Sequence, residues 1–143
     1  MEPHGVLETA VYVDDLDAAE DFYGRVLGLS RINRDRNRHV FFRCGAGVFL
    51  VFNPEATTND PASVDGKMVP AHGAHGPSHM AFRVRDDELA AWRERLGSEH
   101  IAIESEIAWP RGGHSIYFRD PAGNSIEFAS PKLWGLEEDK LPT

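Results

Sequence analysis

Three ionisable side chains stand at equivalent places in strand-like segments, and together they could bind a cation. Glu8, His79 and Glu127 each lie in an alternating segment whose same-face neighbours are small, such as Ala10 and Ala81. Two carboxylates and an imidazole that converge on one cleft would repel or desolvate one another without a cation. The pattern therefore points to a divalent metal. The alternatives are that His79 faces water at a sheet edge and that Glu8 pairs with a nearby arginine.

These residues lie in a chain that repeats its own pattern. Each half has a strand-like segment that leads into a pair of aspartates and then into a helical stretch ending in Leu-Gly. A later segment, residues 47–53, has a counterpart in residues 123–129, and in this alignment Val51 takes the position of Glu127. A repeat of this size predicts two similar supersecondary units that share a core.

The elements that would position the three side chains form two βαβββ modules. In the first module, the patterns predict elements at residues 7–13, 14–28, 29–34, 38–43 and 47–53. In the second module, they predict elements at residues 78–85, 87–96, 100–107, 114–119 and 124–129. We expect an α+β fold with curved mixed sheets around a cleft. A single domain over residues 1–143 is expected, with module 1 at about 6–54, a linker loop at 55–76, module 2 at 77–130 and a C-terminal tail at 131–143.

The connection between the modules is rich in Pro, Gly, Thr, Asn and Ala and has no sustained period. Long loops of this kind often carry function, and this one brings His72 and His75 to within a few residues of His79. We expect it to border the cleft and to order or shift when ligand binds, as a gating loop does. The alternative is a passive surface linker whose histidines stay in water.

Composition limits the classes of partner. The chain has 143 residues, enough for one domain, and its formal net charge of −8 argues against nucleic acid and anionic membranes as partners. The sequence has no apolar run of membrane-spanning length and no visible signal peptide. Cys44 is the one cysteine of the chain, so no intrachain disulfide can form and a cytoplasmic location is expected.

Four stretches carry a family resemblance. They are YVDDL at 12–16, FYGRVLGL at 22–29, SHMAFRV at 78–84 and FRDPAGNSIE at 118–127. With the paired βαβββ units, they make about residues 6–130 resemble the vicinal oxygen chelate superfamily. This group includes glyoxalases, bleomycin resistance proteins, extradiol dioxygenases and fosfomycin-resistance thiol transferases. The combination is typical of the superfamily and does not single out one reaction.

The resemblance implies a metal site built from four strand positions, which in this chain are Glu8, Val51, His79 and Glu127. Valine cannot bind a metal, so the implied ligands are Glu8, His79 and Glu127, with water or substrate in the remaining places. Two carboxylates make the site hard and anionic, which favours Mn, Fe, Ni or Mg, and Zn also fits. The metal would hold two adjacent oxygens of a substrate and stabilise an oxyanion, with Glu127 or Glu8 as the catalytic base.

The implied function is a divalent-metal-dependent enzyme that acts on a small oxygenated molecule, either a dioxygenase or a glyoxalase-type lyase or isomerase. The alternatives are a thiol transferase for antibiotic resistance and a metal-free drug- or metabolite-binding protein. The resemblance also implies a homodimer with shared active sites, in which Glu8 comes from one chain and His79 and Glu127 from the other. Candidate substrate-binding residues are His72, His75, Arg111, His114, Phe49, Val51 and Trp109. Core packing is the alternative for Phe49, Val51 and Trp109, and a solvated hairpin tip is the alternative for Arg111.

Overall fold

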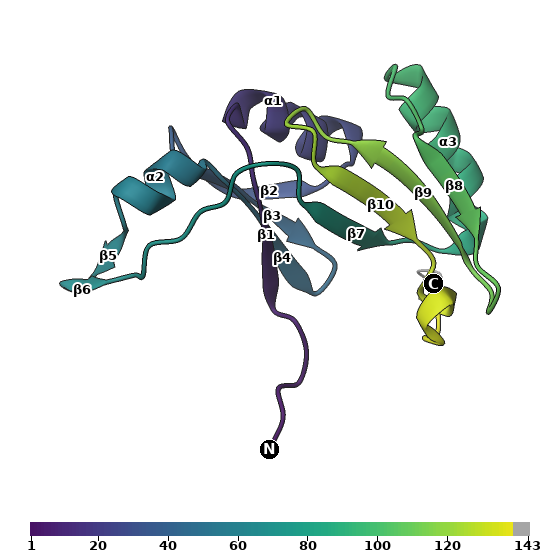
Figure 1. The fold of residues 1–143 in the computed structure, drawn as a ribbon, viewed down its shortest axis with the longest axis horizontal. Coiled ribbons are helices and arrows are strands. Elements are labelled where there is room, and N and C mark those ends of the chain that lie inside the picture. The colour runs from purple at the N-terminus through teal and green to yellow at the C-terminus, as the bar shows by residue number, and fades with distance from the viewer. Residues whose placement is uncertain (139–143) are drawn as a thin grey trace. The chain divides into compact units, whose positions relative to one another are not determined.

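The computed structural model describes residues 1–138 and divides the chain into two compact units (Figure 1). The first unit is Met1–Ser78, and the second runs from His79 to the C-terminus. The last residues of the expected tail, 139–143, lie outside the described part. Each unit has the expected βαβββ order and a four-stranded sheet of mixed strand orientation, so the predicted α+β class and the two similar modules are confirmed.

The first unit builds its sheet from one parallel and two antiparallel pairings. Its elements are β1 (Glu8–Tyr12), α1 (Leu16–Glu20), η1 (Asp21–Val26), β2 (Ser30–Asp35), β3 (His39–Cys44) and β4 (Gly47–Phe52). The sheet order is β1-β4-β3-β2, and β1 runs parallel to β4. Asp15 begins the helical segment by accepting a 3.0 Å hydrogen bond from the Ala18 backbone N–H, which satisfies one of the free donors of the first turn.

The helical segment α1–η1 covers one face of this sheet and forms the core of the unit. Tyr23 is fully buried, and its ring centroid lies 4.8 Å from that of Phe49 on β4. Val51 on β4 is also fully buried on this face. The expectation that Phe49 and Val51 line a binding surface is therefore wrong, because both side chains are enclosed in the core and have no surface with which to touch a ligand.

The pairing of β1 with β4 also corrects the internal alignment. Ala10 pairs with Leu50 in the first unit, and Ala81 pairs with Glu127 in the second unit. Leu50 is thus the structural counterpart of Glu127, one position before the expected Val51. A one-residue slip moves a side chain to the opposite face of a sheet, which is why Val51 points into the core.

The expected linker loop contains regular structure. After β4 come α2 (Pro54–Asn59) and a hairpin of β5 (Ser63–Val64) and β6 (Lys67–Met68). Asn53 starts α2 by accepting a 3.0 Å hydrogen bond from the Glu55 N–H, and Pro54 takes the first helical position, where no N–H is needed. The end of the connection is fixed to α2, because the His72 N–H donates to the Thr57 carbonyl over 3.3 Å.

The second unit repeats the design of the first. Its elements are β7 (His79–Arg83), η2 (Asp86–Glu88), α3 (Leu89–Ser98), β8 (Ser105–Ala108), β9 (His114–Arg119), β10 (Ser125–Ala129) and η3 (Pro131–Trp134). The sheet order is β7-β10-β9-β8, with β7 parallel to β10 (Figure 1). Helix α3 packs on one face, where the Trp92 ring lies 4.3 Å from that of Phe128. The opposite face carries the candidate site.

A tight turn fixes the register between β9 and β10. The buried Asp120 carboxylate accepts hydrogen bonds from the Ala122 N–H at 3.0 Å and the Asn124 N–H at 2.8 Å. Its second oxygen accepts from the Asn124 side-chain amide at 2.9 Å. This Asx-type turn places Tyr117 directly opposite Glu127.

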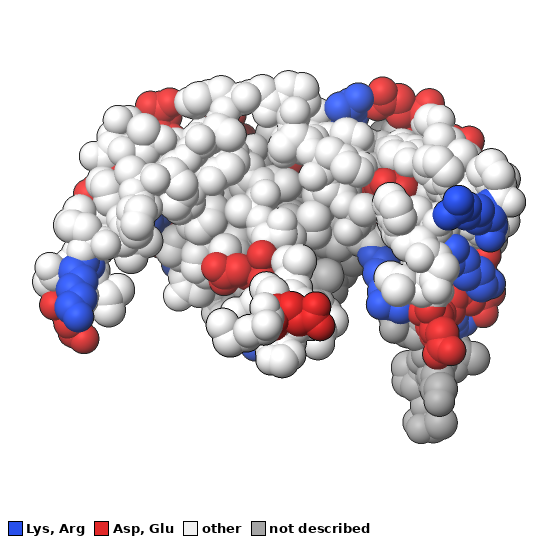
Figure 2. Space-filling view, turned by 60° about the horizontal axis from the view of Figure 1, so that its bottom comes forward, with Lys and Arg blue, Asp and Glu red and all other residues white. Residues whose placement is uncertain are grey.

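Many arginines of the chain form ion pairs. Arg93 binds Glu106 at 2.8 Å and Arg119 binds Glu104 at 2.6 Å. Figure 2 shows the same mixing, because the basic side chains in view lie close to acidic ones. Such exposed pairs contribute little to stability, typically about 0–1 kcal/mol each. None of the helices in residues 1–138 is long and apolar enough to cross a membrane.

A polar cluster, which we call the C-terminal clasp, fixes the segment that follows β10. It consists of Asp86, His114, Ser130, Lys132 and Glu138. The Glu138 carboxylate accepts hydrogen bonds from the Asp86 N–H at 2.8 Å and from the Ser130 hydroxyl at 3.2 Å, and it pairs with Lys132 at 3.2 Å. The Asp86 carboxylate pairs with His114 at 3.3 Å and with Lys132 at 3.4 Å.

Glu138→Gln is expected to lower the melting temperature slightly at neutral pH. The hydrogen bond from the Asp86 N–H, followed by the Lys132 ammonium, holds the pKa of the Glu138 carboxyl below its ordinary value of 4.5. A lowered pKa stabilises the fold above pH 4.5, and this stabilisation is lost as the pH falls through the folded-state pKa. The difference between the thermal melts of the wild type and the variant should therefore shrink as the pH falls below 4.5. Glu137→Gln is the matched control. An equal effect of both substitutions would contradict a specific stabilising role of the Glu138 carboxylate in the clasp.

Candidate functional site

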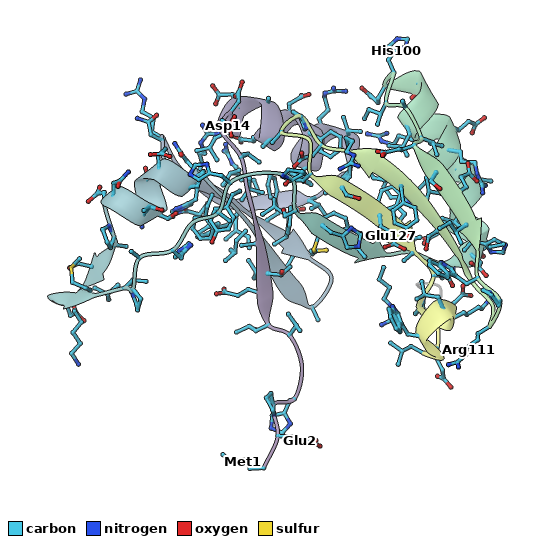
Figure 3. The ribbon with its side chains drawn as sticks, viewed as in Figure 1. Met1, Glu2, Asp14, His100, Arg111 and Glu127 are labelled. Atoms are coloured by element: carbon cyan, nitrogen blue, oxygen red, sulfur yellow. The ribbon has the colours of Figure 1, made fainter. Side chains whose placement is uncertain are left out.

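A histidine and a buried glutamate meet on the open face of the second unit. His79 Nε2 lies 3.2 Å from Glu127 Oε2, and the two residues come from the parallel neighbours β7 and β10. Glu127 is only 6% exposed, whereas His79 is largely open to solvent. In Figure 3, Glu127 lies on β10 with its side chain toward neighbouring strands. The side chains between and beside them, Ala81 and Ala129, are small, so the face keeps room for a ligand.

A backbone hydrogen bond determines which nitrogen of His79 faces the glutamate. His79 Nδ1 lies 3.1 Å from the Ser125 carbonyl oxygen, which can only accept, so Nδ1 carries the proton. In the neutral imidazole, the Nε2 lone pair then points at a carboxylate oxygen. Two acceptors at this distance repel each other unless a cation or a second proton lies between them. Metal-binding histidines are oriented in this way, with the other ring N–H donated to a carbonyl or carboxylate.

A chain of hydrogen bonds supports the Glu127 carboxylate from the neighbouring strand. The Trp109 indole N–H donates to the Ser115 hydroxyl over 2.8 Å, and Ser115 in turn hydrogen-bonds Tyr117. Burial and the hydrogen bond to Glu127 raise the pKa of the Tyr117 phenol. The phenol therefore stays protonated at neutral pH and donates to the carboxylate.

Two other predicted residues of the second unit do not join this group. Arg111 is exposed in the connection between β8 and β9, and Figure 3 shows it well separated from Glu127. His114 pairs with Asp86 in the C-terminal clasp. It alternates with Ser115 along β9, so it points to the α3 side of the sheet rather than to the Glu127 side. The expectation that His114 contacts the substrate beside Glu127 is therefore wrong for this arrangement.

The open face of the first unit combines a carboxylate with aromatic rings. Glu8, Ala10 and Tyr12 share this face of β1, and Glu8 is exposed. The Tyr12 hydroxyl lies 2.7 Å from His72 Nδ1, which ties the end of the connection to β1. The ring of Phe52 lies 4.8 Å from that of His72. His72 is thus held in place by neighbours, and a ligand on this face would meet aromatic surface.

His75 lies on the same connection but is more open than His72. Its Nε2 is 3.2 Å from a carboxylate oxygen of Glu55, and both side chains are exposed. The imidazole is therefore accessible from solvent. A role of His72 or His75 in substrate binding stays a prediction.

The three predicted metal ligands fall into two groups. His79 and Glu127 meet within the second unit, whereas Glu8 belongs to the first. Within the described residues 1–138, no group of three or more His, Cys, Asp or Glu side chains is gathered closely enough to hold a metal ion. The His79–Glu127 pair has the donor chemistry and the orientation of a metal site.

Comparison with known proteins identifies the family. A model of the Glyoxalase/Bleomycin resistance protein/Dioxygenase superfamily matches residues 5–128. The chain belongs to this superfamily. The crystal structure of lactoylglutathione lyase from Agrobacterium tumefaciens is 41% identical, covers 95% of this chain and 100% of its own, and superimposes with a TM-score of 0.87.

More distant members of the superfamily agree with this assignment. A probable lactoylglutathione lyase of Vibrio cholerae is 26% identical over 92% of this chain and 94% of its own length. A glyoxalase/bleomycin resistance protein/dioxygenase from Nocardioides is 20% identical, covers 99% of this chain and 92% of its own, and has a TM-score of 0.70. At this identity, the Nocardioides likeness shows the fold alone.

Proposed function

We propose that this superfamily member is a divalent-metal-dependent lyase of the glyoxalase type. His79 and Glu127 are proposed as metal ligands from the second unit. Glu8 is proposed as the third ligand, supplied by the first unit of a second chain. The observation that carries the proposal is the orientation of His79, whose Nε2 faces a buried carboxylate at 3.2 Å while Nδ1 donates to the Ser125 carbonyl. The names of the two lactoylglutathione lyase relatives support the reaction class.

The bound ion would supply Lewis-acid stabilisation of negative charge on a substrate that chelates it through two adjacent oxygens. The chain supplies the rest. Glu127 would take a proton from the carbon beside these oxygens, and the Tyr117 hydroxyl would stabilise its charged form by donating a hydrogen bond. The bond from Trp109 to Ser115 fixes the far end of this support. His79 is kept in one tautomer by the Ser125 carbonyl.

The assay that tests the reaction class follows thioester formation. Purified protein is reloaded separately with Mn²⁺, Fe²⁺, Ni²⁺, Zn²⁺ and Mg²⁺ and mixed with glutathione and methylglyoxal, whose hemithioacetal is the substrate that a lactoylglutathione lyase requires. We expect metal-dependent thioester formation without oxygen uptake. Oxygen consumption with a catechol would instead indicate a dioxygenase, and addition of glutathione to fosfomycin would indicate a thiol transferase. Stoichiometric binding of a drug without turnover would indicate a binding protein.

The proposal includes a homodimer and a cytoplasmic setting. A second chain offers a way to bring Glu8 to a His79–Glu127 pair, since these residues lie in different compact units. Closed two-fold dimers are the commonest assemblies of soluble proteins. Cys44, the one cysteine of the chain, is consistent with a reducing compartment.

Tyr117→Phe is expected to lower kcat/KM by about 10- to 100-fold, the usual cost of losing a hydrogen bond to a metal-binding group. The substitution removes only the hydroxyl that donates to Glu127 and keeps the ring in place. Tyr23→Phe, which removes the hydroxyl of a tyrosine buried in the core of the first unit, is the control for loss of a phenol. Steady-state kinetics and metal content are measured together. An unchanged kcat/KM for Tyr117→Phe would show that the Tyr117 hydroxyl has no role in the reaction.

A further inference from the structure

An apolar cavity opens on the same sheet face as the His79–Glu127 pair. Its volume is about 260 Å³, and all of its lining residues belong to the second unit. The lining includes Ala81, Arg83, Ala129, Pro131, Trp134 and Leu136. Cavities that bury a drug-sized ligand are about 300–1,000 Å³, so this one suits a single ring or a branched alkyl group rather than a whole molecule.

The floor of the cavity adjoins the metal-binding candidate directly. Ala81 is the cross-strand partner of Glu127, and Ala129 is the next residue on the same face of β10. Neighbouring strands lie about 4.8 Å apart, and residues two apart along a strand about 6.6 Å apart. A ligand held at Glu127 therefore lies beside the floor of the cavity, and a substituent on it can extend over Ala81 and Ala129. Larger side chains at Ala81 and Ala129 would fill this space.

The wall of the cavity is the segment after β10, and it is held in place. Trp134 is 79% exposed and Leu136 is 56% exposed, so both present large apolar surfaces to solvent. Gly135 between them adopts a left-handed conformation (φ 70°), which turns the chain at this point. The C-terminal clasp then fixes the segment at Glu138. Apolar surface held open beside a polar site is typical of ligand pockets, in which a few polar groups orient a ligand within apolar walls.

We propose that this cavity receives an apolar substituent, an aryl or branched alkyl group, of the substrate whose two oxygens are bound at His79 and Glu127. The proposal rests on the proposed function and adds the class of substrate. A substrate with a substituent no larger than methyl leaves Trp134 and Leu136 uncovered, whereas a phenyl group is buried between them and the alanine floor. The chain is then a lyase that prefers aryl- or branched-alkyl-substituted oxygen chelates over methyl-substituted ones.

A matched pair of chelators separates the cavity from the oxygen-binding site. Acetohydroxamate and benzohydroxamate present the same two oxygens and differ only in a methyl or a phenyl group. Their dissociation constants are measured by calorimetry with the full chain in the presence of Mn²⁺. We expect benzohydroxamate to bind about tenfold more tightly, because the ring buries apolar surface. Trp134→Ala and Leu136→Ala should each reduce this preference several-fold and leave acetohydroxamate binding unchanged. Val64→Ala, which shortens an exposed apolar side chain of the first unit, should have no effect.

A second readout follows the Trp134 indole N–H signal by NMR, which should shift with benzohydroxamate and not with acetohydroxamate. Equal affinities for both chelators would overturn the proposed role of the cavity while the proposed function stands. A preference for benzohydroxamate that survives both Trp134→Ala and Leu136→Ala would do the same. A shift of the Trp134 signal by benzohydroxamate without any binding of acetohydroxamate would support the cavity and count against the oxygen-binding site. If neither chelator binds, the cavity proposal is wrong together with the function on which it rests.

Discussion

Glu127→Gln is expected to lower kcat/KM of the lyase reaction by about 10³-fold, within the range for loss of a general base. The substitution keeps the shape of the side chain and its capacity to accept from Tyr117 through the amide oxygen. It removes the negative charge that faces His79 Nε2 at 3.2 Å. Both proposed roles of Glu127, metal ligand and proton acceptor, require that charge. Steady-state kinetics with glutathione and methylglyoxal, or with the chelate substrate that is found, measure the loss.

The matched control for this variant is Glu106→Gln. Glu106 lies on β8 in the same sheet, but its carboxylate pairs with Arg93 of α3 on the other face. We expect Glu106→Gln to keep nearly full activity, and both variants to melt close to the wild type when metal is removed. If Glu127→Gln retained more than about a tenth of the wild-type kcat/KM, a base role of this size would be excluded.

A mixture of two inactive variants is expected to recover activity. Glu8→Ala and His79→Ala are each expected to be inactive, because each removes a proposed ligand. If active sites are shared between two chains, a mixed dimer contains one site with both substitutions and one intact site. Random exchange makes about half of the dimers mixed, so about a quarter of the wild-type activity should return.

The same mixture distinguishes the shared arrangement from a site within one chain. In a one-chain site, each chain carries its own defect, and mixing restores nothing. A mixture of Glu127→Gln with His79→Ala is the control. Both residues belong to the second unit, so each site of a mixed dimer carries one of the two substitutions and no activity should return. Sedimentation of the wild type at micromolar concentration accompanies the assay. A monomer, or a mixture that stays inactive, would contradict the shared site.

The faces of the second sheet were predictable from the sequence. Met80 and Phe82 alternate with His79 and Ala81, and this period of two assigns each side chain to a face without knowledge of tertiary structure. The pairing of β7 with β10 then brings His79 and Glu127 to 3.2 Å.

The position of Val51 was not predictable in the same way. Residues 48–52 are all apolar, so the alternation that marks a face is missing in β4. The alignment of glycines before β4 and β10 suggested a register that is one residue off, and only the pairing of Ala10 with Leu50 corrects it. Parallel sheets buried on both faces commonly lose this signal.

The sequence left the role of Tyr117 undecided and did not reveal α2, for different reasons. The role of Tyr117 depends on its register opposite Glu127, which the Asp120 turn sets and which alternation along one strand does not reveal. The start of α2 was marked by Asn53 and Pro54, a capping residue followed by proline. The helix has only six residues and includes β-branched threonines, so its periodicity was too short to detect.

Elemental analysis of the purified protein shows whether His79 and Glu127 hold a metal ion. The protein is prepared without a metal-affinity column, dialysed, and measured beside His79→Gln, Glu127→Gln and the control Glu106→Gln. We expect about one divalent ion per chain in the wild type and in Glu106→Gln, and a loss of most of that metal in the other two variants. A full metal content in His79→Gln and Glu127→Gln, or a wild type that takes up no divalent ion when reloaded, would contradict this expectation.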